Sequence, residues 1–197
     1  RARPHILLES CASGGNRFDL GMLCYSQQIW ASDDTDPIER LKIQKGFSYF
    51  YPPVCMGAHV SQSPHQQTLR STPLSTRFNV AAFGALGYEL DLAELSPIEH
   101  RQIKEQISFY KQVRHTLQFG RFYRYQLPEM NKDIFLAVAP DQSHAVLSFV
   151  QTLATAGDSN DVLRVKGLDA NARYRLTAVP QKVSLARFGG LLKHIMP

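Results

Sequence analysis

The chain has 197 residues, of which 44% are hydrophobic and 20% charged, and its formal net charge is +5. This composition indicates a globular protein with enough apolar side chains for one large domain or two small ones. The lysines and arginines are scattered, and their densest patch, residues 114–124, matches no known nucleic-acid-binding module. We therefore expect no nucleic-acid partner.

The cysteine and histidine residues indicate the compartment of the protein and whether it binds a metal ion. Three cysteines, Cys11, Cys24 and Cys55, form an odd number without a CxxC motif, which is typical of a reducing compartment, so we expect a cytoplasmic location. The histidines show no metal-ligand spacing, so no metal and no other cofactor is predicted. No apolar run reaches the ~20 residues of a membrane helix, so no membrane partner is expected.

The first structured stretch is the apolar run 5–9, which predicts a buried strand. The small residues 10–15 follow it, and such a loop lets a ligand approach the backbone amides closely. A plain turn is the alternative, because two glycines after a strand are common. The chain starts with Arg-Ala-Arg-Pro rather than Met, which suggests part of a longer protein.

The second apolar run, residues 24–30, ends at a cluster of three acidic residues, Asp33, Asp34 and Asp36. Carboxylates at the carboxyl end of a strand are typical of the active sites of α/β enzymes. The alternative is a helix start, where an aspartate caps the first turn. We expect Asp34 and Asp36 to cap or support the loop before a short amphipathic helix at 38–44.

A third strand is predicted at 47–51, and the following residues 54–76 are predicted to form one long loop. Such length favours a functional or interface role, and we expect a subunit contact there. His59 in this stretch either faces a site or is satisfied by local hydrogen bonds. The small-residue stretch 79–87 suits tight packing.

A strong amphipathic helix is predicted at 98–118, after the capping residue Ser96 and before Gly120. Beyond it lie five short runs rich in β-branched and aromatic residues, at 122–127, 133–139, 143–153, 162–168 and 173–177. These runs predict an antiparallel β module. The chain therefore reads as α/β then all-β, with domains at 1–118 and 119–197.

Several motifs, in order, resemble the α-galactosidases of glycoside hydrolase family 36. Residues 9–19 (ESCASGGNRFD) resemble the cysteine–glycine loop of that family, and residues 28–40 (QIWASDDTDPIER) resemble its acid/base segment. Residues 52–61 and 83–91 are similar to further family segments. An ordered set of motifs is far more specific than a single one. The β part fits the family's C-terminal domain more loosely.

The resemblance implies a fold for each part of the chain. Residues 1–118 would be the second half of a (β/α)8 TIM barrel, with its fifth to eighth strands at 5–9, 24–30, 47–51 and 79–86. The helix at 98–118 would close the barrel, and a small antiparallel β-sandwich would follow over 119–197. The full-length protein would be a homo-oligomer.

The resemblance also implies hydrolysis of terminal non-reducing α-D-galactosyl residues, as in melibiose and raffinose, with retained configuration. Asp33 would be the general acid/base. Cys11 would contact the 2-hydroxyl of galactose, and Ser13 and Gly14 would bind the sugar through the loop backbone.

The family's nucleophile lies in a Lys-Trp-Asp motif that this chain lacks, since Trp30 is its only tryptophan. A retaining glycosidase needs two carboxyl groups about 5–5.5 Å apart, so we expect the chain by itself to be inactive. Two alternatives stay open: a non-catalytic carbohydrate-binding or assembly portion, and an α-galactosyl transferase of the same family.

Overall fold

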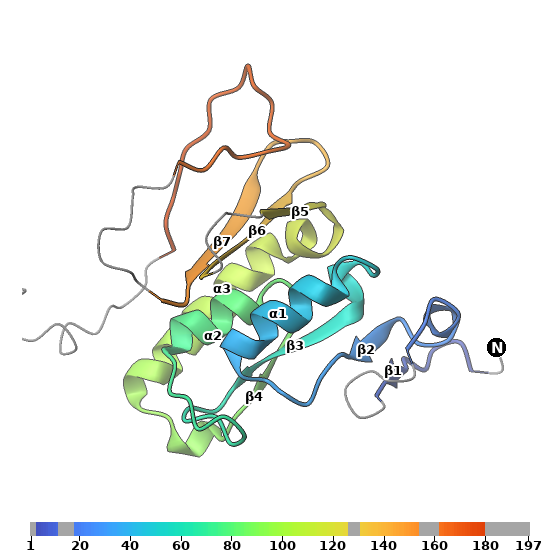
Figure 1. Ribbon diagram of the computed structural model, residues 1–197, viewed down its shortest axis with the longest axis vertical. Helices are drawn as coiled ribbons and strands as arrows, with labels where there is room; N and C mark the ends of the chain where they lie inside the picture. Colours follow the sequence, from blue (N-terminus) through green and yellow to red (C-terminus); the bar gives the residue numbers. More distant parts are fainter. Residues whose placement is uncertain (1–2, 12–17, 126–130, 154–161, 180–197) are drawn as a thin grey trace, which may run out of the picture.

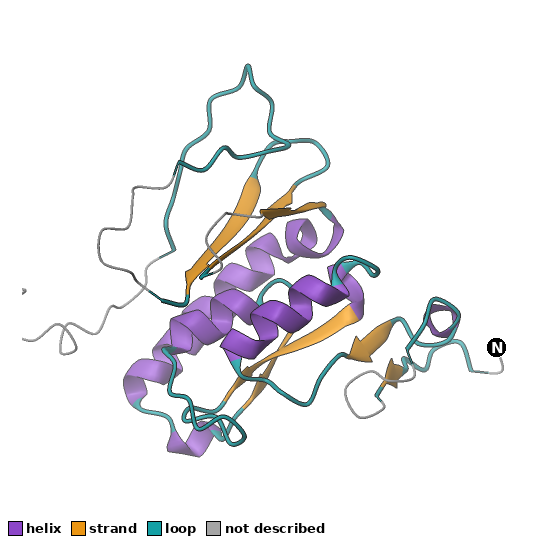
Figure 2. Ribbon diagram, viewed as in Figure 1, coloured by secondary structure: helices purple, strands orange, loops and turns teal. Residues whose placement is uncertain are grey.

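In the part of the chain that the structure describes, two β-sheets have helices between them. A computed structural model describes residues 3–11, 18–125, 131–153 and 162–179. In Figure 1, helices α1 to α3 lie between a parallel sheet and an antiparallel sheet, and Figure 2 shows the same layers by secondary structure. The predicted order, α/β followed by all-β, is confirmed in these residues.

The parallel sheet has four short strands in the order β1-β2-β3-β4. They are β1 (Glu9–Ser10), β2 (Gln28–Trp30), β3 (Met56–Ser61) and β4 (Ala85–Glu89). All neighbours run parallel, so their carboxyl ends lie at one edge of the sheet. The predicted strands at 5–9 and 24–30 are confirmed only at the ends of these runs.

The apolar residues 6–8 are not part of the buried strand that their composition predicts, and Leu7 is 89% exposed. An apolar side chain is buried only where another element covers it. In the described part of the chain, β1 is an edge strand with β2 as its neighbour. The helices cover the other end of the sheet, as Figure 1 shows.

The helices begin and end where local sequence signals place them. Helix α1 (Pro37–Phe47) is capped by Asp36, whose Oδ1 accepts hydrogen bonds from the amides of Ile38 and Glu39. Helix α3 (Pro97–Phe119) starts with a capping box of Ser96 and Glu99. Both confirm their predictions, and α2 (Leu74–Ala81) lies between them. No helix in the described ranges combines the length and apolarity needed to cross a lipid bilayer.

Three short 3-10 helices lie in the connections between the described elements. They are η1 (Met22–Cys24), η2 (Pro53–Cys55) and η3 (Leu92–Glu94).

The predicted strand at 47–51 is wrong, because Phe47 ends α1 and residues 48–51 form a turn. The amide of Tyr51 donates to the carbonyl of Phe47 at 3.0 Å, and the two rings lie 5.0 Å apart. The aromatic residues thus follow a helical spacing, not an alternating one. The strand is β3, inside the stretch 54–76, which is therefore not one long loop.

The expected strand at 79–86 is also wrong, because it spans the end of α2 and the start of β4. A tight turn joins them at Gly84, where an added Cβ would lie 2.7 Å from the Cβ of Ala58. Apolar residues stand on both sides of this turn, and those before it are buried, so no polar break in the sequence marks the boundary.

The antiparallel sheet consists of β5 (Arg121–Tyr125), β6 (Lys132–Val138) and β7 (Ala145–Gln151), which confirms the first three predicted runs. The predicted strands at 162–168 and 173–177 are wrong, because these residues form a loop. The hydroxyl of Tyr125 holds this loop by donating to the carbonyl of Arg164 and accepting from the amide of Lys166.

An apolar core of described residues joins the two sheets through the helices. It includes Ala58 and Val60 of β3, residues of all three helices, and residues of β6 and β7. Three rings form its contact with the antiparallel sheet: Phe83, Phe122 and Phe135 lie 5.7 to 6.2 Å apart. The two parts of the chain are therefore expected to stabilise each other.

We predict that Phe135→Ala lowers the free energy of unfolding by about 3–5 kcal/mol, because the ring is only 2% exposed and its loss leaves a cavity. Urea denaturation of the chain measures this effect. The matched control is Phe149→Ala on β7, where the ring is 41% exposed, with an expected cost of about 1 kcal/mol or less. Equal effects of the two substitutions would contradict a shared core at Phe135.

Candidate active site

The two faces of the parallel sheet carry different side chains. Side chains alternate along a strand, so one set faces the helices and the other faces away. Ala58, Val60 and Leu86 belong to the core on the helix side. The opposite face carries polar and aromatic residues, such as Trp30 and His59. The carboxyl edge of such a parallel sheet is where α/β enzymes place their sites.

A row of contacts crosses this polar face from strand to strand. Gln28 Nε2 donates to Glu9 Oε2 at 2.7 Å. The ring of Trp30 lies 4.4 Å from that of His59 between centroids, and His59 Nδ1 lies 3.2 Å from Glu89 Oε2. His59 thus has local partners and also faces the candidate site.

Glycines make room for the two rings on this face. A Cβ added at Gly57 would lie 3.0 Å from Trp30 Cε3, and one at Gly87 would lie 2.6 Å from His59 Cδ2. Both rings therefore pack against a glycine of the neighbouring strand, where an added side chain would meet them.

Asp33 lies in the loop that follows β2, and its side chain is exposed. The indole Nε1 of Trp30 donates to Asp33 Oδ1 at 2.9 Å, which leaves Oδ2 available to a ligand. The amide of Asp36 donates to Asp34 Oδ1 at 3.0 Å. The predicted roles of Asp34 in supporting the loop and of Asp36 in capping α1 are therefore confirmed.

Arg40 lies beneath this loop and is 2% exposed. Its guanidinium donates to the backbone carbonyls of Ser32 and Gly57 and lies 5.4 Å from the centre of the Trp30 ring. Burial lowers the pKa of Arg40 to about 10, although the charges of Asp34 and Glu89 act in the opposite direction. The side chain is thus a cation at neutral pH. In the sequence, the only indication of this role of Arg40 is a positively charged residue on the side of α1 that is buried.

A buried polar network holds the end of the Asp33 loop. Asp36 is fully buried, and its carboxylate accepts from Thr68 Oγ1 at 2.7 Å and pairs with the guanidinium of Arg70. Thr35 Oγ1 lies 3.0 Å from His65 Nε2. No local pattern predicts these roles of His65, Thr68 and Arg70, because their partners Thr35 and Asp36 lie 30 or more positions away in the chain.

The predicted sugar-binding loop begins at the same edge of the sheet. Cys11 directly follows β1 and is exposed, and Ser10 is in register with Ile29 of β2. The structure thus brings Cys11 and Asp33 to the ends of neighbouring strands. Ser13 and Gly14 lie outside the described residues. Among the described residues, no cluster of three or more His, Cys, Asp or Glu side chains has a geometry that holds a metal ion.

A small cavity of about 240 Å³ lies at this edge, beside the Asp33 loop. Its lining includes Thr35 of that loop, Ser61 at the end of β3, His65, and Glu89 at the end of β4. The cavity adjoins the polar face, although neither Asp33 nor Cys11 lines it.

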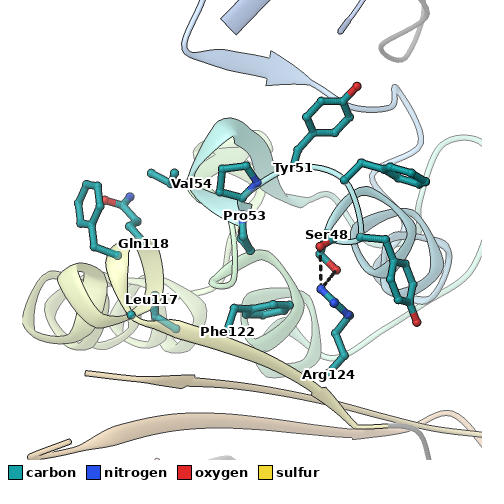
Figure 3. Close-up of a pocket in the computed structure, with 13 residues that line it drawn as sticks. Ser48, Tyr51, Pro53, Val54, Leu117, Gln118, Phe122 and Arg124 are labelled. Atoms are coloured by element: carbon teal, nitrogen blue, oxygen red, sulfur yellow. Dashed lines mark hydrogen bonds between the residues drawn. The ribbon is translucent and has the colours of Figure 1, made fainter. Parts of the chain in front are cut away.

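A larger cavity of about 480 Å³ lies elsewhere, between residues 48–54 and the junction of α3 with β5 (Figure 3). Arg124 reaches across it, donates to the carbonyl of Ser48 at 2.7 Å and lies 4.4 Å from the centre of the Tyr49 ring. Its lining residues 48–54 come before β3 in the chain, and none of the predicted site residues lines this cavity. Residues from both parts of the chain line this cavity.

Comparison with known families agrees with this geometry. The profile of the Melibiase family matches residues 1–120, and that of the glycosyl hydrolase family 36 C-terminal domain matches residues 133–192. The chain therefore belongs to the melibiase family, within glycoside hydrolase family 36.

Curated relatives are similar over most of this chain. The α-galactosidase AgaA of Geobacillus stearothermophilus is 48% identical over 174 residues, which are 88% of this chain and 24% of the relative. The α-galactosidase Mel36A of Lactobacillus acidophilus is 45% identical over 87% of this chain and 24% of its own length. The chain spans about a quarter of these relatives.

Solved structures share the fold of this portion. AgaA of Geobacillus stearothermophilus in complex with raffinose superposes with a TM-score of 0.82 and 48% identity, over 85% of this chain and 24% of that one. The α-galactosidase of Lactobacillus brevis gives a TM-score of 0.86 at 45% identity, over 96% of this chain and 26% of that one.

We predict that Gly87→Ala moves the His59 ring away from Trp30, because the added methyl group would lie 2.6 Å from it. Trp30 is the only tryptophan, so its emission reports this change directly. The spectrum should shift toward that of His59→Ala. The control is Gly46→Ala on α1, where an added Cβ meets nothing within 4 Å and the emission should not change. An unchanged spectrum in Gly87→Ala would contradict the ring contact.

The pKa of Asp36 makes a second, pH-dependent prediction. Burial would raise this pKa, but hydrogen bonds from Thr68 and two backbone amides, with the charge of Arg70, hold it below its ordinary value of 3.8. The ionised form therefore stabilises the fold above that value, and this contribution is lost as the pH falls through the lowered pKa.

Asp36→Asn should cost about 1.5–3 kcal/mol of unfolding free energy at neutral pH, since charged hydrogen bonds are lost. The difference from the parent chain should shrink at about pH 3, as measured by urea denaturation at both pH values. Glu105→Gln, at an exposed position of α3, should have little effect at either pH. A pH-independent cost of Asp36→Asn would contradict the assignment.

Proposed function

We propose that the full-length protein is a retaining α-galactosidase that removes terminal α-D-galactosyl residues from sugars such as melibiose and raffinose. The observation that carries this proposal is the exposed carboxylate of Asp33, oriented by Trp30 at the carboxyl edge of the sheet. Family membership supports it, as do relatives solved in complex with raffinose and with stachyose.

The proposal includes a closed barrel in the full-length protein. Strands β1 to β4 would be its fifth to eighth strands, and the polar face with Trp30 and His59 would line its interior. The antiparallel sheet would belong to a C-terminal β-sandwich, with the domain boundary at residues 118–119. We also propose that the full-length enzyme is cytoplasmic and forms a homo-oligomer.

Asp33 would act first as an acid and then as a base. It gives its proton to the glycosidic oxygen while the bond from that oxygen to the anomeric carbon breaks and a nucleophilic carboxylate bonds to that carbon. Water then attacks the same carbon, Asp33 takes the proton of the water, and the carboxylate leaves. Two inversions give galactose with retained configuration.

The remaining predicted residues would bind the sugar. Cys11 lies at the end of the strand next to β2, where it would contact the 2-hydroxyl of galactose. Ser13 and Gly14 would add backbone contacts in the same loop. The nucleophile would come from the rest of the full-length protein, since this chain has no Lys-Trp-Asp motif. A sugar acceptor in place of water would make the enzyme a transferase.

We predict that a fusion of this chain to the preceding portion of Geobacillus AgaA hydrolyses an aryl α-galactoside and raffinose with retention, whereas the chain by itself does not. Asp33→Asn in the fusion should lower kcat about 10²–10⁴-fold, because proton transfer is lost. Release of the aryl group gives the rate, and NMR of the first-formed galactose gives the anomer.

Asp141→Asn is the matched control, because Asp141 is an exposed aspartate in the turn before β7. Its rate should equal that of the parent fusion. Inverted product, or full activity in Asp33→Asn, would contradict the proposed function. Hydrolysis by the chain by itself would show that a second carboxylate of this chain completes the site.

A further inference from the structure

We propose that His65 is a positioning residue for the general acid, because it holds the side chain of Thr35 in the loop that carries Asp33. This inference rests on the proposed function, since it concerns the group that would donate the proton. His65 lies between β3 and α2, 32 positions after Asp33 in the chain, yet it contacts the same loop. We call residues 62–73 the clamp loop.

The clamp loop is itself closed by backbone hydrogen bonds. The amide of His65 donates to the carbonyl of Arg70 at 2.9 Å, and the amide of Leu69 donates to the carbonyl of His65 at 2.8 Å. These bonds give a compact turn with the His65 ring directed inward and 2% exposed.

The partners of the ring define its tautomer. Nδ1 lies 3.4 Å from the amides of Gln67 and Thr68, so it accepts hydrogen bonds from them. The hydrogen of neutral imidazole is then on Nε2, which donates to Thr35 Oγ1 at 3.0 Å. Nδ1 thus accepts hydrogen bonds within the clamp loop, and Nε2 donates to the loop that carries Asp33.

The same turn reaches the Asp33 loop a second time. Thr68 donates to the carboxylate of Asp36, and Arg70 forms an ion pair with it. The clamp loop therefore holds both Thr35 and Asp36, which follow Asp33 by two and three positions. On the other side of Asp33, Arg40 donates to the carbonyl of Ser32.

Asp33 depends on these anchors because its own side chain is exposed and is held by the indole of Trp30. A general acid works only within about 2.6–3.2 Å of the oxygen that it protonates. A displacement of about 1 Å can cost about 10²-fold in rate. Loss of the bond between His65 and Thr35 therefore impairs proton donation before it impairs the fold.

Two substitutions at His65 separate its two roles in the proposed fusion with AgaA. His65→Asn keeps an acceptor at the place of Nδ1 and so preserves the turn, but it loses the donor to Thr35. His65→Gln keeps a donor at the place of Nε2. Thr35→Val removes the same hydrogen bond from its other end and is the independent second variant.

The readout is the dependence of the rate on the leaving group. Phenyl α-galactoside needs protonation of its leaving oxygen, whereas dinitrophenyl α-galactoside releases a stable anion without it. His65→Asn and Thr35→Val should lower kcat/KM on the phenyl substrate about 10–100-fold, because kcat/KM reports the step in which the leaving oxygen is protonated and that proton transfer is misplaced. The kcat/KM of the same variants should stay within about 3-fold of the parent on the dinitrophenyl substrate, and His65→Gln should recover most of the kcat/KM on the phenyl substrate. Asp33→Asn should show the same pattern with a larger loss.

The matched control is His100→Asn, at an exposed position near the start of α3, which should match the parent on both substrates. Equal losses of His65→Asn on both substrates would indicate a merely structural role and overturn the inference. So would an unchanged rate of His65→Asn on the phenyl substrate while Asp33→Asn is impaired. Full activity of Asp33→Asn would instead overturn the proposed function, and this inference with it.

Discussion

The guanidinium of Arg40 is buried beneath the loop that carries Asp33, and the surrounding structure is arranged to satisfy it. A buried cation is strongly unfavourable unless hydrogen bonds replace its lost hydration. Two backbone carbonyls, of Ser32 and Gly57, and the face of Trp30 take that role. One cation thereby joins α1 to two neighbouring strands and to the loop between them. The position of Asp33 follows from this, because Ser32 directly precedes it and Trp30 binds its carboxylate.

The need to pair polar groups also separates the two faces of the parallel sheet, and the candidate site lies on the polar one. The helix face is apolar and contributes to a core that reaches the antiparallel sheet through Phe83 and Phe135. The opposite face keeps its polar side chains paired along a row that includes Trp30, His59 and Glu89. Stability and chemistry are thus divided between the two faces of one sheet. A substitution on the helix face acts on the fold, and one on the polar face acts on the site.

Sequence reasoning succeeded where local signals dominate. The capping residues Asp36 and Ser96 mark the starts of α1 and α3, and runs rich in aromatic and β-branched residues mark β5 to β7. It failed at 47–51, where aromatic residues at helical spacing were interpreted as a strand, and at 54–61, where Gly57 and His59 obscured the alternation of β3. Both glycines of the polar face, Gly57 and Gly87, are explained only by the rings that cross them.

The sequence by itself determined the family, the order of the two parts, and Asp33 as the candidate acid/base, because these depend on motifs and on contacts between near neighbours. Only the tertiary structure showed which residues hold that acid in place. Arg40, His65 and Arg70 are ordinary polar residues in the sequence, and their partners are up to 34 positions away. Hydrogen bonds between distant residues leave no periodic pattern, because each pairing depends on how the sheet brings the loops together.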